Sequence, residues 1–152
     1  MNRVSGVAAG MAAVAMLCSQ PVLAAPMSKA EKLRRLDIML MVTGLRCRTT
    51  SDNFQADYGR FTTRHIAELN KASDALKTEL AASHGAGGAN RALDKLSVTM
   101  ANAYGQGHPW LNCAQLKQVA RGLAEASGPE PLLAAADQLL ASSGTPQFAW
   151  AR

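Results

Sequence analysis

The sequence predicts an all-α protein, a bundle of four to five helices that pack around one long central helix. Large side chains recur at steps of three and four residues between Leu45 and Leu80, which is the spacing of one helical face. No stretch of four or more residues alternates between apolar and polar, and β-branched residues are few. These observations argue against a sheet, and the other helices are expected to pack against the long one.

Residues 1–24 have the pattern of a cleaved secretory signal peptide. Arg3 precedes an apolar run over 7–17, and Val22 and Ala24 occupy the −3 and −1 positions of a cleavage site after Ala24. A membrane anchor is the alternative, but the run has about half of the roughly 20 apolar residues that a span requires. The expected location is therefore periplasmic or secreted, with no membrane span after cleavage.

The remaining chain is expected to form a single helical domain over residues 25–146, followed by a C-terminal tail over 147–152. Sixteen basic and 11 acidic residues are encoded, and without Arg3 the net charge is 15 − 11 = +4. The basic residues are spread along the chain and do not interleave with aromatic residues, so no nucleic-acid partner is predicted. The role of the tail residues Phe148 and Trp150 stays open.

The first helix is predicted over 28–47. Ser28 and Glu31 have the spacing of a capping box, in which each side chain bonds a backbone N–H at the start of the helix. Gly44, in the last turn, is either a close-packing position or a weak point of this helix.

The long helix is predicted to follow a polar turn over 48–53 and to run to about residue 82. Its candidate N-caps are Thr50, Ser51 and Asp52. Gly59 is the candidate position for a bend, and the three glycines within 85–88 predict the end of the helix. Three shorter helices are then predicted over 88–104, 110–127 and 130–142, separated by segments that contain glycine and proline.

A disulfide between Cys47 and Cys113 is the predicted crosslink. Three cysteines are encoded, and Cys18 is expected to leave with the signal peptide. An even pair in an oxidising compartment favours a disulfide over free thiols, and the absence of a CxxC motif or a nearby histidine pair argues against zinc.

The sequence contains no GxSxG or HExxH motif, so a non-enzymatic role is favoured and no cofactor is predicted. His65 lies beside the apolar stripe of the long helix, where a hydrogen-bonded core residue is the ordinary expectation. The alternative is a haem held non-covalently between a histidine and a methionine inside the bundle, since CxxCH is absent.

The densest group of hydrogen-bonding side chains surrounds Cys47, at the corner between the first two predicted helices. This candidate polar binding corner comprises Arg46, Arg48, Asp52, Asn53 and Gln55. Capping and packing of the corner is the alternative role for the same residues.

Several short segments resemble a group of small exported bacterial proteins of unknown function. The segments are Leu45-Arg46-Cys47, Asp52-Asn53-Phe54 with Tyr58 and Phe61, Arg91-Ala92-Leu93-Asp94 with Met100-Ala101-Asn102, and Cys113. The resemblance covers roughly residues 33–123. It implies an exported helical domain with two paired cysteines, and it transfers no catalytic residue.

The leading functional hypothesis is a non-enzymatic exported domain that binds a protein or a cell-envelope component. The alternative is a carrier that holds a small ligand or cofactor in the bundle interior. An enzyme whose site has no sequence motif is the third hypothesis.

Overall fold

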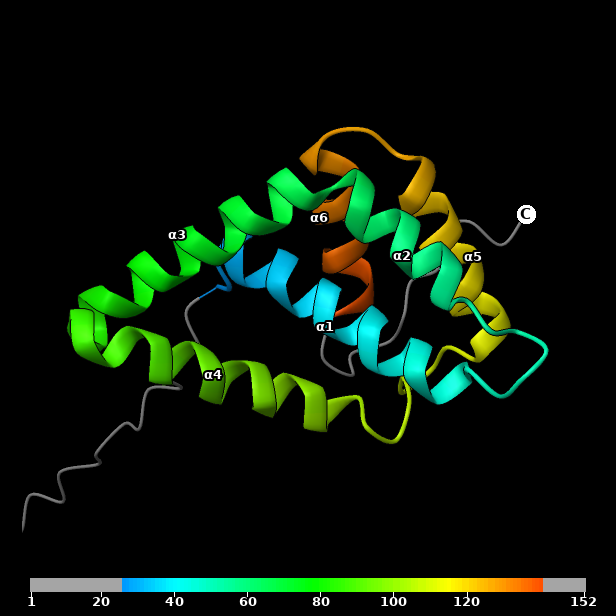
Figure 1. The fold of residues 1–152 in the computed structure, drawn as a ribbon, viewed down its shortest axis with the longest axis horizontal. Helices are drawn as coiled ribbons and strands as arrows, with labels where there is room; N and C mark the ends of the chain where they lie inside the picture. Colours follow the sequence, from blue (N-terminus) through cyan, green and yellow to red (C-terminus); the bar gives the residue numbers. More distant parts are fainter. Residues whose placement is uncertain (1–25, 141–152) are drawn as a thin grey trace, which may run out of the picture.

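The computed structural model describes residues 26–140, and this part of the chain is entirely helical (Figure 1). Its elements are α1 (Lys29–Cys47), α2 (Gln55–Arg64), α3 (Ile66–His84), α4 (Ala86–Ala103), α5 (Cys113–Glu125) and α6 (Pro129–Leu139). The all-α prediction is confirmed. The predicted count of four to five helices is wrong, because six lie within the described residues. The predicted signal peptide over 1–24 and the tail over 147–152 lie outside them.

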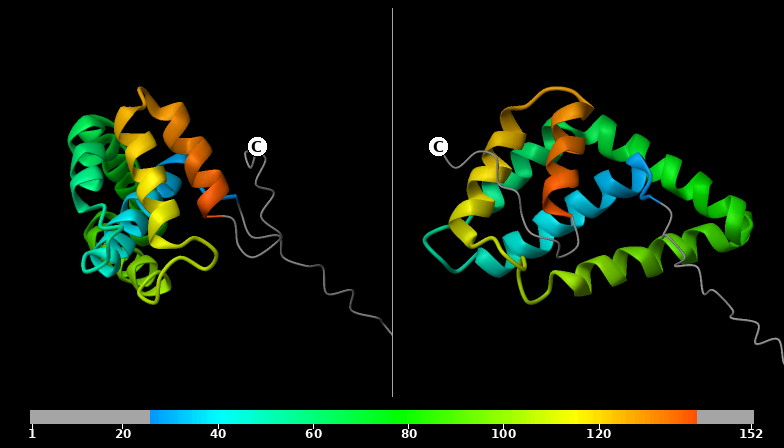
Figure 2. Two further views of the ribbon diagram at one scale, coloured as in Figure 1. Left: turned by 90° about the vertical axis from the view of Figure 1, so that its right-hand side faces the viewer. Right: turned by 180° about the vertical axis from the view of Figure 1, so that it is seen from behind.

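The central element is α1, which packs against each of the other five helices. Three of its side chains, those of Leu36, Met39 and Leu40, are completely buried. Figures 1 and 2 show α3 and α4 on one part of α1, with α2 and α5 toward its C-terminal end and α6 crossing it. The prediction that the long helix of the 45–80 stretch is central is therefore corrected, since the amphipathic spacing of that stretch does not reveal which helix contacts all the others.

The predicted long helix is divided in two at His65, whose backbone has φ −105° and ψ 19°. The two halves pack on different partners, because α2 lies against α5 whereas α3 lies against α1 and α4. The His65 ring is buried and its Nε2 lies 2.8 Å from the carbonyl oxygen of Leu123 in α5. Gly59, the predicted site of a bend, lies within α2 instead.

The α3–α4 hairpin turns at Gly85, whose φ of +72° is in the region that glycine adopts most easily. The end of the preceding helix at the glycine cluster is thus confirmed. Gly87 and Gly88 belong to the first turn of α4, which starts two residues earlier than the predicted residue 88.

The residues that cap the starts of α1, α2 and α5 differ in part from the predictions. Ser28 is the N-cap of α1, as predicted, and accepts a hydrogen bond from the Glu31 backbone at 3.1 Å. The Glu31 half of the predicted capping box is wrong, because the Glu31 carboxylate bonds Arg35. The N-cap of α2 is Phe54, with no side-chain cap bond, so none of the three predicted residues caps it. A complete capping box instead joins Asn112 and Gln115. It starts α5 at 113, not 110.

The crosslink between Cys47 and Cys113 is present, with a sulfur–sulfur distance of 2.02 Å. Cys47 is the last residue of α1 and Cys113 is the first residue of α5. The bond therefore joins the end of the central helix to the helix that packs on α2.

Candidate functional site

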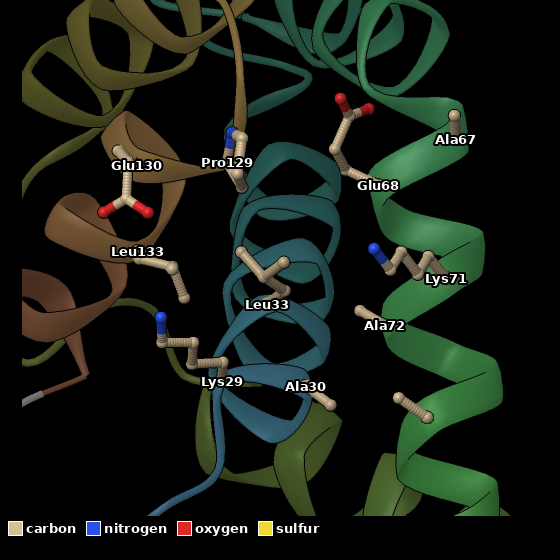
Figure 3. Close-up of a pocket in the computed structure, with 11 residues that line it drawn as sticks. Lys29, Ala30, Leu33, Ala67, Glu68, Lys71, Ala72, Pro129, Glu130 and Leu133 are labelled. Carbon is tan, nitrogen blue, oxygen red and sulfur yellow. The ribbon is translucent and has the colours of Figure 1, made fainter.

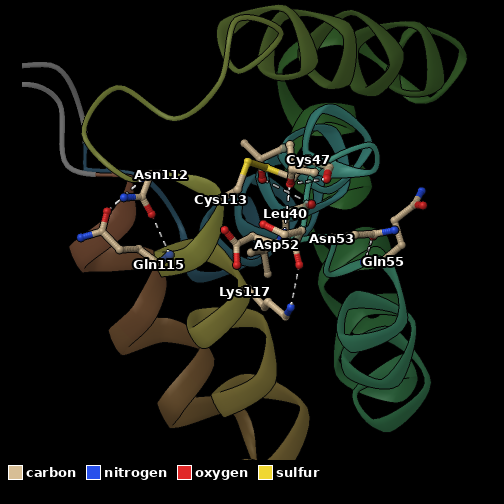
Figure 4. The surroundings of a disulfide bond; sticks show 12 residues. Leu40, Cys47, Asp52, Asn53, Gln55, Asn112, Cys113, Gln115 and Lys117 are labelled. Carbon is tan, nitrogen blue, oxygen red and sulfur yellow. Dashed lines mark hydrogen bonds between the residues drawn. A yellow bond between two sulfur atoms is a disulfide. The ribbon is translucent and has the colours of Figure 1, made fainter.

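The predicted polar corner forms the surface beside the disulfide, where local hydrogen bonds use several of its groups (Figure 4). The Asn53 side-chain oxygen accepts from the Gln55 backbone N–H at 3.0 Å. The Asp52 backbone N–H donates to the Thr50 hydroxyl at 3.2 Å, and that hydroxyl donates to the Cys47 carbonyl at 2.8 Å. These contacts fix the turn between α1 and α2, as the capping alternative requires.

The two arginines of the corner, Arg46 and Arg48, are exposed. The Arg46 side chain lies against Gly107, where a Cβ atom would come within 3.3 Å of the Arg46 Nε. From α5, the Lys117 ammonium donates to the Ser51 carbonyl at 3.3 Å. The corner therefore contacts both the segment around Gly107 and α5. Its role as a binding site stays a prediction.

Two of the three histidines occupy structural positions. His65 bonds the Leu123 carbonyl, as described above. His108 is buried, its Nε2 lies 3.1 Å from the Leu139 carbonyl oxygen, and its Nδ1 accepts from the Leu111 N–H at 3.3 Å. Burial lowers the pKa of His108 from its ordinary value, and the bond to Leu139 partly opposes this. Both ring nitrogens of His108 are engaged within the protein.

A half-buried polar cluster links α1 to α2 and α4. The Tyr58 hydroxyl donates to Asp37 at 2.9 Å, Arg34 approaches the same carboxylate at 3.8 Å, and Arg34 also donates to Ser97 at 3.2 Å. Burial raises the pKa of Asp37, and the bond from Tyr58 and the charge of Arg34 partly offset this. Burial and the Asp37 carboxylate also raise the pKa of Tyr58, so its hydroxyl stays protonated and is a poor base. The cluster ties helices together.

A groove of about 420 Å³ lies over α1, between α3 and α6 (Figure 3). Its floor and walls are largely apolar and include Ala30, Leu33, Ala72 and Leu133. Figure 3 shows Leu33 in the middle, with the α3 wall on one side and the α6 wall on the other. The volume falls within the range of roughly 300–1,000 Å³ that is typical of small-molecule sites. We call this feature the α1–α3–α6 groove.

Four charged residues border the α1–α3–α6 groove, and their signs are separated along it. On the α3 wall Glu68 lies nearer the Pro129 end, and Lys71 lies nearer the start of α1. On the other side Glu130 lies nearer the Pro129 end than Lys29 does. Within the described residues none of these four groups forms an ion pair with a protein group.

Contacts beside the groove hold its walls on α1. The Lys32 ammonium lies 2.6 Å from the Asp137 carboxylate, which joins α1 to α6. The Ser28 hydroxyl donates to the Glu79 carboxylate at 2.7 Å, which joins the start of α1 to α3. Exposed pairs of this kind contribute little stability, about 0–1 kcal/mol each, but they fix the spacing of the walls.

Sequence reasoning did not find the α1–α3–α6 groove, because it is assembled from helix starts that are far apart in the chain. One local signal is present in the sequence. Lys29 is the first residue of α1, where a cation opposes the helix dipole, so helix stability does not explain it. The predicted corner residues line none of this groove.

Two features are absent from residues 26–140. No group of three or more His, Cys, Asp or Glu side chains that could hold a metal ion was found there. No helix in this range is sufficiently long and apolar to cross a membrane.

Fold and site together define a small disulfide-linked helical domain with a preformed apolar groove. Comparison of the chain with protein-family models, curated proteins and solved structures found no match in any of the three.

Proposed function

We propose that the protein is exported and acts without catalysis as a binding domain, holding a segment of a partner protein in the α1–α3–α6 groove. The observation that carries this proposal is the groove itself, an apolar surface bordered by charges that lack ion-pair partners in the described chain. The signal-peptide pattern of residues 1–24, the disulfide and the resemblance to small exported bacterial proteins support export.

Site-specific photocrosslinking in the native cell envelope tests the proposal. A benzophenone amino acid is placed at Ala75, which is exposed and lines the groove. A second variant carries it at Gln55 in the polar corner, and a matched control carries it at Ala82, which is exposed on the same helix as Ala75 but is not among the groove residues. The proposal expects one discrete protein adduct at Ala75 and none at Ala82.

Other outcomes would overturn the groove assignment. An adduct at Gln55 alone would move binding to the predicted polar corner. A small molecule that copurifies with the native protein and is retained by Ala75→Trp, without any protein adduct, would support the alternative of a carrier that holds its ligand in the bundle interior.

Export is tested separately on the mature protein. Its N-terminus is expected at Ala25, and its intact mass should be two hydrogens lower than that of the reduced chain. Retention of residues 1–24 in the envelope fraction, or free alkylation of Cys47 and Cys113 in the folded protein, would contradict this part of the proposal.

A further inference from the structure

The α1–α3–α6 groove is built from side chains of three helices, which limits the kind of peptide backbone that it can receive. Most backbone N–H and C=O groups along these walls are paired inside the helices, and the N–H groups of the first helical turns do not form the continuous row that an added strand requires. An extended peptide would leave part of its own backbone unpaired against Leu33 and Leu133. A helix satisfies its own backbone and presents only side chains to such a surface.

The groove dimensions fit a short helical segment. Ala67 and Ala75, at the two ends of the α3 wall, are eight residues apart, which corresponds to about 12 Å or roughly two helical turns. Small residues face the space from α1 and α3, namely Ala30, Ala67, Ala72 and Ala75. Because helices approach to about 8–10 Å where the contacting side chains are small, a partner helix can lie close to both walls.

The charges at the two ends complement one direction of that helix. Glu68 and Glu130 lie at the end where a helix N-terminus, with its partial positive charge, would be favoured. Lys29 lies at the other end, where the partial negative charge of a C-terminus would be favoured, and Lys71 lies midway along the α3 wall, between Ala67 and Ala75. An acyl chain with an anionic head would complement the lysines but would place its apolar end beside Glu68 and Glu130, whose carboxylates the first turns of α3 and α6 already favour.

We propose that the groove receives about two turns of a partner's amphipathic helix, with a basic N-terminal turn beside Glu68 and Glu130 and an acidic C-terminal turn that extends from the level of Lys71 to Lys29. This inference rests on the proposed function, since it names the class and direction of the segment that the groove binds. The partner helix would run antiparallel to α1 and parallel to α3 and α6.

A synthetic peptide tests the class of partner. It has capped ends, a side-chain staple that keeps it helical, Leu and Ala on one face, two Lys in its first turn and two Glu in its last turn. A scrambled peptide of the same composition, without the apolar face, is the control. Titration into the isotope-labelled mature protein should shift the amide resonances of the groove residues. The designed peptide should bind at least about tenfold more tightly than the scrambled peptide, because only the designed peptide can bury a continuous apolar stripe.

A nitroxide on the peptide N-terminus tests the direction. Amides near Ala67 and Glu130 should broaden more strongly than those near Lys29 and Ala75, because the effect falls steeply with distance. Stronger broadening near Lys29 and Ala75 would overturn the proposed direction. Equal binding of the scrambled peptide would contradict a helix as the ligand.

Charge variants test the role of the end charges. The double variant Glu68→Gln and Glu130→Gln should bind the designed peptide about threefold to tenfold more weakly, as expected when two partly exposed charge contacts are removed. The control pair Asp74→Asn and Lys77→Gln changes exposed charges on α3 that do not line the groove, and it should leave affinity unchanged. An equal loss of peptide affinity in the two double variants would contradict specific contacts with Glu68 and Glu130.

The two proposals fail in different ways. If the benzophenone at Ala75 captures a protein but the designed peptide does not bind, the helix inference fails and the binding function stands. If the peptide binds but Ala75 captures no protein in the envelope, peptide affinity alone does not make the groove the site of a physiological partner, and the proposed function fails.

Discussion

Two histidine side chains serve as caps for helix C-termini to which they do not belong. The last carbonyls of an α-helix have no partner within it, and burial without a donor is costly. His65 lies within hydrogen-bond distance of Leu123 near the end of α5, and His108 reaches Leu139 at the end of α6. Each ring therefore stabilises a contact between distant parts of the chain, a role that residue type alone does not reveal.

Replacement of His65 by leucine should lower the free energy of unfolding by about 1–3 kcal/mol, because it leaves the Leu123 carbonyl without its donor in a buried position. Urea denaturation of the oxidised protein measures the effect. His84→Leu, at an exposed histidine in the last turn of α3, is the control and should change stability by less than about 0.5 kcal/mol. Equal losses in the two variants would contradict the capping role.

Protonation of His108 should destabilise the fold. Because burial lowers its pKa below the ordinary value near 6.5, the unfolded chain takes up the proton first as the pH falls. The stabilising contribution is present above about pH 6.5 and is lost as the pH falls through the folded-state pKa. Burial raises the pKa of Asp37, so this group contributes in the opposite direction, and the comparison is therefore made with His108 variants that all retain Asp37.

The measurement is the free energy of unfolding at pH 7.5 and at pH 5.5. His108→Gln keeps one donor and one acceptor without titrating, so the difference between the two pH values should shrink in this variant. His84→Gln is the matched control and should retain the wild-type difference. An unchanged pH dependence in His108→Gln would rule out His108 as its source.

At the scale of elements, helical spacing predicted where helices lie but not where the long one is divided. The stripe with Phe61 and Leu76 is buried as expected. The division at His65 arises because α2 and α3 pack on different helices, which is a property of tertiary structure rather than of local propensity. By contrast, the start of α5 was available from sequence, since Asn112 and Gln115 have capping-box spacing.

The two interpretations of Gly44 are decided by the packing of α1 against the turn that precedes α2. A Cβ atom at this position would lie 3.3 Å from Cε2 of Phe54, whose side chain is completely buried. Gly44 is therefore a close-packing position, although it lies inside a helix where alanine would ordinarily be favoured by about 1 kcal/mol.

Gly44→Ala should consequently destabilise the protein by about 1–3 kcal/mol, the usual range for overpacking a core. Gly59→Ala in α2 and Gly122→Ala in α5 are matched controls, because a Cβ atom at either position meets nothing within 4 Å. Both controls should gain up to about 1 kcal/mol from helix propensity. Thermal unfolding of the three variants makes the comparison, and a stabilised Gly44→Ala would show that Phe54 can move aside.

At the scale of the whole molecule, the candidate sites differ in how far sequence could reveal them. The polar corner comes from one short stretch of the chain, from Arg46 to Gln55. The high density of polar residues in that stretch is visible in the sequence. The groove combines the starts of α1, α3 and α6, and nothing in a linear pattern brings Leu33 beside Leu133. Cysteine pairing was predictable because the sequence predicts that Cys18 belongs to a cleaved signal peptide, which would leave two cysteines.

The disulfide crosslinks α1 to α5, whereas α3 and α4 are joined to α1 by packing and hydrogen bonds. It closes a loop with a sequence separation of 66 residues between the end of α1 and the start of α5. In the chain-entropy account such a loop contributes up to about 4 kcal/mol through the unfolded state. The α3–α4 hairpin and α5 lie at opposite ends of the molecule in Figure 1, so loss of the crosslink should not act equally on both.

The double variant Cys47→Ala and Cys113→Ala should therefore lose up to about 4 kcal/mol of unfolding free energy and should also change the order of local opening. In hydrogen exchange under native conditions, amides of α5 should lose more protection than those of α3 and α4, because α5 loses the covalent link at its first residue and keeps only its non-covalent contacts with α1, α2 and the residues that flank them. The groove, built from α1, α3 and α6, should remain formed, so the designed helical peptide should still bind to the folded variant. Uniform loss of protection across all six helices would show that the domain opens as one cooperative unit, with the crosslink acting only on the unfolded chain.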